Sequence, residues 1–193
     1  EILRTYAPAV EPYSVDEAFM DMTGTEGLWG SPIAAADRIR NQIREELGFT
    51  VNVGISENKL LAKMAGDFQK PDRVHTLWKE EIPEKMWPLP VSDLFFVGRA
   101  AERTLALLGI RTIGELAAAD PRLLKAHLKK HGERIWEFAN GMDSSAVEPL
   151  LPPGKGYGNS VTLPFDVEDA QAAKRVLLSL SETVGGRLRE AGG

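Results

Sequence analysis

A helix with clear signals at both ends, between residues 31 and 48, is the feature that most limits how this chain folds. Ser31 is a residue type that caps helix N-termini, and Pro32 suits the first helical position. Apolar residues then recur at helical spacing, and Gly48 is a typical helix terminator. The sequence therefore predicts an amphipathic helix with one face against a core.

Strand signals lie on both sides of this helix. Residues 50–55 alternate like a strand, and Asn58 can cap a second helix that Pro71 ends. With the segment around Asp16 taken as a further strand, the first 78 or so residues alternate strand and helix. This alternation predicts an α/β or α+β piece, and α+β is the fold class that we expect for the chain.

The strand signals end near residue 80, where several prolines break up any regular element. Short helices with good end signals follow. Thr112 and Glu115 form a capping box, and Asp120 with Pro121 marks another helix start. The pattern predicts a compact all-helical unit.

The Pro- and Gly-rich stretch at residues 151–158 is the best linker candidate in the chain. Beyond it, residues 161–164 look like a strand and residues 167–191 like a helix. One strand and one helix cannot bury a core alone, so we expect this third unit to be incomplete.

Composition narrows the classes of function. The 193 residues include no cysteine, which rules out disulfides and thiolate metal sites and fits a reducing compartment. No window approaches a membrane-spanning length of apolar residues. The formal net charge of −5 argues weakly against a nucleic-acid binder, but the field at a groove depends on where Lys and Arg lie.

Two adjacent acids, Asp16 and Glu17, interrupt an otherwise apolar stretch. Neighbours on an ideal strand point to opposite faces, so the pair can converge on one cation only at a bend or a strand end. Mg²⁺ is typically held by one or two carboxylates together with substrate phosphates. The pair fits metal-assisted phosphoryl transfer, and it also fits a solvent-facing hairpin end.

Lysines and glycines supply two further candidate sites. Lys59, Lys63 and Lys70 lie on or beside the helix after Asn58, where they can meet a polyphosphate or simply decorate a surface. Gly98 and Gly109 each precede a predicted helix. Such a helical hairpin offers backbone N–H groups to a DNA phosphate, or it is a plain packing motif.

The order and spacing of these blocks are more specific than any one of them. The stretches YSVDEAF, VNVGIS, NKLLAKMA, QKPD, WPLPV, LLGIRTIGELA and GNSVTLP together resemble the Y-family DNA polymerases, the translesion enzymes of the DNA polymerase IV and UmuC type. The resemblance covers essentially the whole chain. It implies that residues 1–77 are the latter part of the palm, residues 78–150 a helix-hairpin-helix thumb, and residues 159–193 the start of the little finger.

The resemblance also implies roles for single residues. Asp16 and Glu17 match the paired palm carboxylates that hold two catalytic Mg²⁺ ions, and Lys70 matches the lysine that reaches the triphosphate of the incoming dNTP. The residues expected to contact the primer–template DNA are Lys63, Gly98, Arg99, Gly109 and Arg111. A sliding clamp, bound through a region beyond this chain, and a bacterial, cytoplasmic, nucleoid-associated location are further implications.

Three departures from the family pattern bear on what this chain does alone. The family's first motif, an early palm aspartate followed by the fingers and the steric gate, precedes the block around Asp16 and is expected to lie outside the chain. The little finger is expected to be truncated. Phe96 stands where the thumb usually offers a first hairpin glycine. We therefore expect the fragment by itself to be inactive in primer extension.

Two other functions compete with a polymerase. One is a non-catalytic DNA-binding module or polymerase-like accessory protein of the damage response, in which the acids are vestigial. The other is an unrelated metal-dependent phosphohydrolase, which would need no template and leaves the helical half unexplained.

Overall fold

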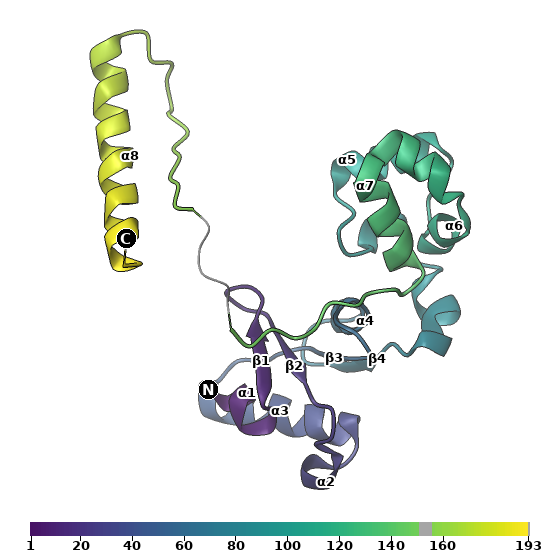
Figure 1. The fold of residues 1–193 in the computed structure, drawn as a ribbon. Helices are drawn as coiled ribbons and strands as arrows, with labels where there is room; N and C mark the ends of the chain where they lie inside the picture. The colour runs from purple at the N-terminus through teal and green to yellow at the C-terminus, as the bar shows by residue number, and fades with distance from the viewer. Residues whose placement is uncertain (151–155, 193) are drawn as a thin grey trace. The chain divides into compact units, whose positions relative to one another are not determined.

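The computed structural model describes residues 1–150 and 156–192, which Figure 1 shows as a ribbon. The chain divides into two compact units, Glu1–Leu150 and Leu151–Gly193. Helices occur together with two small sheets, so the predicted α+β fold class is confirmed. None of the helices in the described residues is both long enough and apolar enough to cross a membrane.

A β-hairpin carries the two adjacent acids. Its strands β1 (Ala9–Pro12) and β2 (Ala18–Asp21) pair antiparallel. The segment around Asp16, which we predicted as a strand, is the turn between them. The predicted strand is therefore present but displaced: β2 begins at Ala18, after the chain has reversed direction, and the residues at the tip have no partner strand.

A parallel pair of strands forms the second sheet. β3 (Val53–Ile55) pairs with β4 (Val74–Thr76), and the connection between them contains a helix. The strand predicted over residues 50–55 is present but shorter, because β4 offers partners to only three of its residues.

The predicted helix between residues 31 and 48 is α3 (Pro32–Leu47). The Ser31 side chain accepts a backbone hydrogen bond at its start, and Gly48 ends it in the left-handed conformation with φ 75°. Ile39 and Ile43 are buried on the face that packs against the N-terminal segment and the hairpin.

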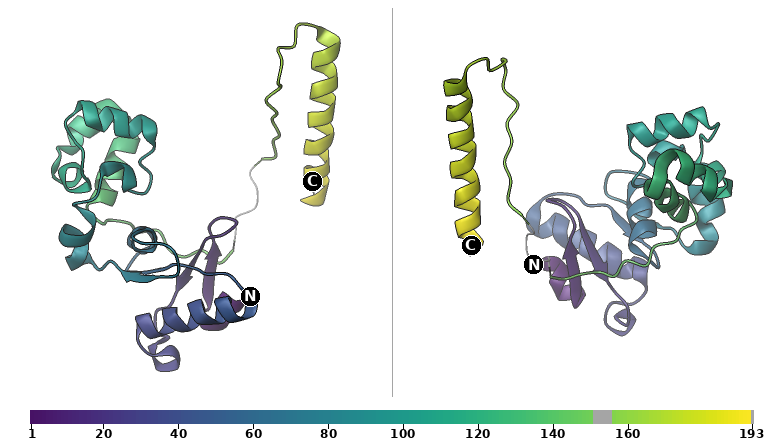
Figure 2. Two further views of the ribbon diagram at one scale, coloured as in Figure 1. Left: turned by 180° about the vertical axis from the view of Figure 1, so that it is seen from behind. Right: turned by 45° about the horizontal axis from the view of Figure 1, so that its top comes forward.

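Two short helices, α1 (Ile2–Tyr6) and α2 (Glu26–Trp29), complete this part of the fold. The indole Nε1 of Trp29 donates a hydrogen bond of 2.9 Å to the Tyr6 carbonyl oxygen, and the two rings lie 4.6 Å apart. Figure 2 shows α3 beside the β1–β2 hairpin in two further views.

Helix α4 (Lys59–Asp67) connects the sheets to the helical half of the first unit. The Asn58 side chain caps it by accepting a hydrogen bond of 2.8 Å from the Leu61 amide, as its sequence predicts. Its buried side chains belong to the same hydrophobic core as residues from the later helices, among them Leu105, Ile113, Leu124, Ile135 and Phe138. α4 therefore packs against the β3–β4 sheet and also against the later helices.

The helical half contains α5 (Arg99–Leu107), α6 (Ile113–Ala118) and α7 (Pro121–Ala139). The predicted capping box at the start of α6 is present, because Thr112 and Glu115 exchange side-chain and backbone hydrogen bonds. α7 is interrupted at Lys129, where φ is 56° and ψ is −138°.

The proline-rich segment before α5 forms single helical turns rather than strands. These turns are a 3₁₀ turn at Lys79–Glu81, a π turn at Ile82–Met86 and a second 3₁₀ turn at Val91–Asp93. They place Ile82, Met86 and Val91 in the core.

The second unit contains one long helix, α8 (Ala170–Glu190), which Asp169 caps and in which no residue is fully buried. The strand predicted at residues 161–164 is wrong, because that segment pairs with no strand in the described residues. Residues 151–155 of the predicted linker lie outside the described residues.

Candidate active-site groove and DNA-facing helices

The tip of the hairpin brings Asp16 and Glu17 to a bend, the geometry in which adjacent carboxylates can face one cation. The amides of Tyr13 and Ser14 donate hydrogen bonds of 2.9 and 3.1 Å to the Glu17 carbonyl oxygen. The Ser14 hydroxyl donates to the Asp16 carboxylate at 2.9 Å. These three hydrogen bonds fix the turn between β1 and β2, and with it the backbone positions of both acids.

Two of the three predicted lysines are linked to Glu17 by a row of ion pairs. Lys63 Nζ, on α4, lies 2.7 Å from Glu17 Oε1 and 2.9 Å from Asp67 Oδ2. Lys70 Nζ lies 2.8 Å from Asp67 Oδ1. Asp67 therefore bridges both lysines. The sequence analysis missed this role, although the spacing of Asp67, four residues after Lys63 and three before Lys70, is the helical signal that could have found it.

The charges of Lys63 and Asp67 stabilise each other. Burial alone would lower the pKa of Lys63, but its hydrogen bonds to Asp67 and Glu17 outweigh burial and the pKa is raised. Burial alone would raise the pKa of Asp67, but hydrogen bonds from Lys63 and Lys70 outweigh it and the pKa is lowered. Both groups are therefore charged at neutral pH.

Lys59, the third lysine, is committed to a structural role instead. Its Nζ lies 2.7 and 2.9 Å from the two carboxylate oxygens of Glu11 on β1 and donates to the Ala146 carbonyl oxygen at 3.1 Å. The expectation that Lys59 meets a polyphosphate is therefore not supported. The Glu148 amide also donates to Glu11, at 2.8 Å.

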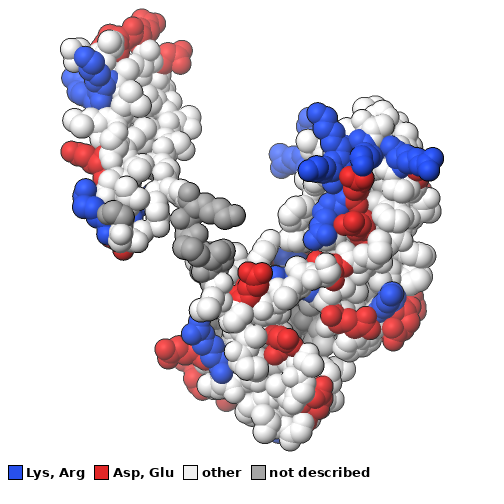
Figure 3. Space-filling view, in the orientation of Figure 1, with Lys and Arg blue, Asp and Glu red and all other residues white. Residues whose placement is uncertain are grey.

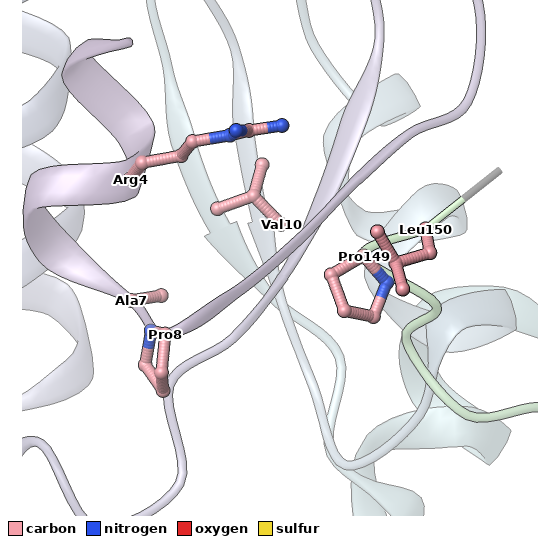
Figure 4. A pocket seen from close by; sticks show the side chains of 6 residues that line it. All are labelled: Arg4, Ala7, Pro8, Val10, Pro149 and Leu150. Carbon is pink, nitrogen blue, oxygen red and sulfur yellow. The ribbon is translucent and has the colours of Figure 1, made fainter.

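Residues 143–150, which we call the strap, thus cross from the end of the helical half back to the hairpin. Burial alone would raise the pKa of Glu11, but hydrogen bonds from Lys59 and from the Glu148 amide lower it. Beyond the ion pair, Pro149 and Leu150 line a small pocket of about 260 Å³ with Pro8 and Val10 (Figure 4). At the other end of the strap, Asp143 accepts a hydrogen bond of 3.2 Å from the Leu60 amide in the first turn of α4.

A groove of about 960 Å³ joins the hairpin tip to α4 and its C-terminal extension. Its polar rim includes Asp16, Glu17, Lys63, Asp67 and Lys70, and apolar side chains of β2, α3 and β3 form much of the remaining lining. Carboxylates and ammonium groups alternate along this rim, and together they suit a phosphate-bearing molecule with a divalent cation.

The donor set at this groove fits Mg²⁺ only in part. Within residues 1–150 and 156–192, no three His, Asp or Glu side chains gather closely enough to hold a metal ion by themselves. Two carboxylates suit a Mg²⁺ that takes its remaining ligands from water and substrate phosphates.

The helical half carries the other predicted contacts. Gly98 is the N-cap of α5, and Gly109 adopts φ 79° in the turn between α5 and α6. Six exposed cations form no ion pair with a carboxylate among the described residues: Arg99, Arg103, Arg111, Arg122, Lys129 and Lys130. Figure 3 shows Lys and Arg side chains gathered over this part of the molecule.

A count of charged residues over this segment alone would have predicted the basic surface, whereas the net charge of the whole chain does not indicate it. Residues 94–131 contain seven Lys or Arg and only three acidic residues, although the whole chain carries a formal charge of −5. Phe96 precedes the first of these cations and adopts φ 78°, the left-handed conformation for which glycine is the usual residue. The turn before α5 thus keeps a backbone conformation typical of glycine although its residue is phenylalanine.

Comparisons with known proteins agree along the chain. Models of the impB/mucB/samB family match residues 1–67, the helix-hairpin-helix motif of that family matches residues 79–110, and its C-terminal domain matches residues 154–193. Two curated relatives are DNA polymerase IV of Clostridium acetobutylicum, 47% identical over 98% of this chain, and DNA polymerase IV 2 of Bacillus subtilis, 45% identical over 99%. The chain belongs to the Y family of DNA polymerases.

Solved Y-family structures share the fold. A Y-family DNA polymerase chimera of Dbh and Dpo4 has a TM-score of 0.81 at 26% identity, covering 96% of this chain and 54% of its own. DinB from Sulfolobus solfataricus has a TM-score of 0.69 at 26% identity over the same shares. The chain spans 48% of each of the two curated relatives, about half their length. The match to the helix-hairpin-helix motif includes Gly98 and Gly109.

Proposed function

We propose that the polypeptide carrying this Y-family chain is an error-prone DNA-directed DNA polymerase that acts in translesion synthesis and DNA repair. The observation that supports this most is the position of Asp16 and Glu17 at the hairpin tip, where they line one groove with Lys63 and Lys70. Relatives named DNA polymerase IV support the reaction class. Nothing in the groove favours the non-catalytic alternative.

Asp16 and Glu17 would hold the divalent ions that DNA polymerases of this family generally use. Bound Mg²⁺ supplies stabilisation of the attacking 3′-oxygen and of the leaving pyrophosphate oxygen. The acids position these charges, and Lys70, with 61% of its side chain exposed, is free to leave Asp67 for the triphosphate of a dNTP. Lys63 keeps its second partner, Asp67, when Glu17 turns to a metal ion.

The three family matches support a division of the chain by role. We propose that residues 1–77 belong to the palm, residues 78–150 to the thumb and residues 159–193 to the little finger. The basic surface of the helical half suits a sequence-independent grip on primer–template DNA. A sliding clamp and a place on the bacterial nucleoid are proposed from the family resemblance alone.

Primer extension by the complete polypeptide that carries this chain tests the proposal. Asp16→Asn and Glu17→Gln are expected to reduce the rate by more than about a hundredfold, since even outer-shell changes at metal sites cost tenfold to a hundredfold. Lys70→Ala is expected to raise KM for the dNTP. Lys79→Ala is the matched control, because it removes an exposed lysine outside the groove lining.

Two outcomes contradict the proposal. Extension that is unchanged by Asp16→Asn and Glu17→Gln would remove the acids from the active site. Phosphate release from small esters without a template would favour the metal-dependent phosphohydrolase.

A further inference from the structure

Phe96 is an exposed aromatic residue held in an unfavourable backbone conformation. Its φ of 78° crowds the Cβ of any L-residue, whereas glycine adopts such angles readily. Yet 54% of the residue is exposed to solvent. Burial of the ring in the core therefore does not account for the presence of phenylalanine at this turn.

The neighbouring aromatic residues hold the ring in place without covering it. The ring of His131 stacks on it at 6.4 Å between centroids, and the buried Phe138 meets it edge-on at 5.7 Å. Two residues before His131, Lys129 is also in a positive-φ conformation. Among the described residues only three that are not glycine have positive φ, and Phe96 and Lys129 are two of them.

The charge around the ring identifies the class of partner. Phe96 begins a stretch that is rich in cations without carboxylate partners, including Arg99, Lys129 and Lys130. A nucleic-acid strand presents the complementary pattern, because apolar sugar edges alternate with anionic phosphates. An apolar protein surface would match the ring but not the cations.

We propose that Phe96, oriented by His131, packs on the deoxyribose edge of duplex DNA while the adjacent cations take the flanking phosphates. The proposal rests on the DNA-binding role proposed above and adds a specific apolar contact to it. Where a glycine turn would offer only backbone N–H groups, this chain adds a side chain to the contact.

Fluorescence anisotropy with residues 1–193 tests this, using a labelled duplex and a single strand of the same sequence at several salt concentrations. Phe96→Ala is expected to weaken duplex binding about three- to tenfold, the effect of uncovering part of a phenyl ring. The salt dependence should not change, since no charge is lost. Phe96→Trp should restore binding.

Two glycine variants separate backbone strain from binding. Relative to Phe96→Ala, which loses the same ring contacts, Phe96→Gly is expected to raise Tm by about 2–4 °C because glycine relieves the turn, while both variants weaken duplex binding. Lys129→Gly relieves the second strained residue but removes a cation, so it should reduce the slope of log affinity against log salt by about one.

Each result decides the proposal. Salt-dependent duplex binding that Phe96→Ala leaves unchanged overturns the sugar contact but leaves the proposed DNA-binding role intact. A loss confined to the single strand also overturns it, since the ring would then stack on bases. If the wild-type chain binds no duplex at low salt, both this contact and the DNA-binding role of the helical half are overturned.

Discussion

Replacing Glu11 by glutamine should undock the strap from the hairpin. Glu11 is the one carboxylate that Lys59 contacts among the described residues, and it also accepts the Glu148 amide. The substitution keeps the shape of the side chain and removes its charge. Lys59 would then be left with the Ala146 carbonyl oxygen and a glutamine oxygen as its acceptors.

The size of the effect follows from the burial of the pair. The side chains of Lys59 and Glu11 are 17% and 14% exposed. Loss of one partner costs about 3–5 kcal/mol in a fully buried ion pair and less than about 1 kcal/mol at the surface. Glutamine keeps one acceptor oxygen for Lys59 and the Glu148 amide, but its NH2 group replaces the second oxygen that Lys59 contacts. We therefore expect a loss of about 2 kcal/mol of unfolding free energy, or roughly 4–8 °C in Tm for a unit of this size.

Urea or thermal unfolding of wild type and Glu11→Gln measures this loss. Glu45→Gln is the matched control, because Glu45 is exposed on α3 and makes no ion pair within the described part of the chain. Lys59→Met completes a double-mutant cycle, and the double variant should be less destabilised than the sum of the single ones. Limited proteolysis should cut the strap faster in Glu11→Gln.

The pH dependence gives the decisive check. Because the pKa of Glu11 is lowered in the folded protein, its stabilisation is complete above the unfolded value of about 4.3 and is lost as pH falls through the folded value. The stability gap between wild type and Glu11→Gln should therefore be full at neutral pH and should close in acid. A Glu11→Gln variant that unfolds like wild type at pH 7 would refute the reasoning.

Two further outcomes are expected. Gly54→Ala should destabilise the chain by about 3 kcal/mol in chemical unfolding, because the added Cβ would collide with the Ala62 carbonyl oxygen of α4; Gly27→Ala, with open space around it, should not. Calorimetric titration of residues 1–193 should show no tight, stoichiometric Mg²⁺ binding, because Lys63 pairs with Glu17 and no third ligand is near among the described residues; micromolar binding abolished by Glu17→Gln would contradict this.

Local signals were sufficient for most of the helices. The ends of α3 follow from a serine cap and a terminal glycine, and both act through their own backbone neighbourhood. The strands were harder, because a strand is defined by its partner. Residues 161–164 have a strand-like composition yet pair with nothing in the described residues. A hairpin end was likewise only one of two interpretations of Asp16 and Glu17 until the pairing of β1 with β2 was known.

The different roles of the lysines at the site could not be predicted from the sequence either. Lys59 and Lys63 are the same residue type, one helical turn apart on α4. Glu11 and Glu17, from the strand and the tip of one hairpin, each pair with one of them. Sequence alone treats both pairs as equal. Their second acceptors make them different.

Lys59 donates its remaining hydrogen bond to a backbone carbonyl of the strap, which cannot follow a substrate into the groove. Lys63 donates its own to Asp67, which also holds the exposed Lys70. A phosphate that takes Lys70 leaves Asp67 with Lys63 alone, and a cation that takes Glu17 leaves Lys63 with Asp67 alone. After either change, every charged group still has a partner of opposite charge. The ion pairs of Lys63 and Lys70 can therefore rearrange when a ligand binds, while the Glu11–Lys59 pair continues to hold the strap on the β-hairpin.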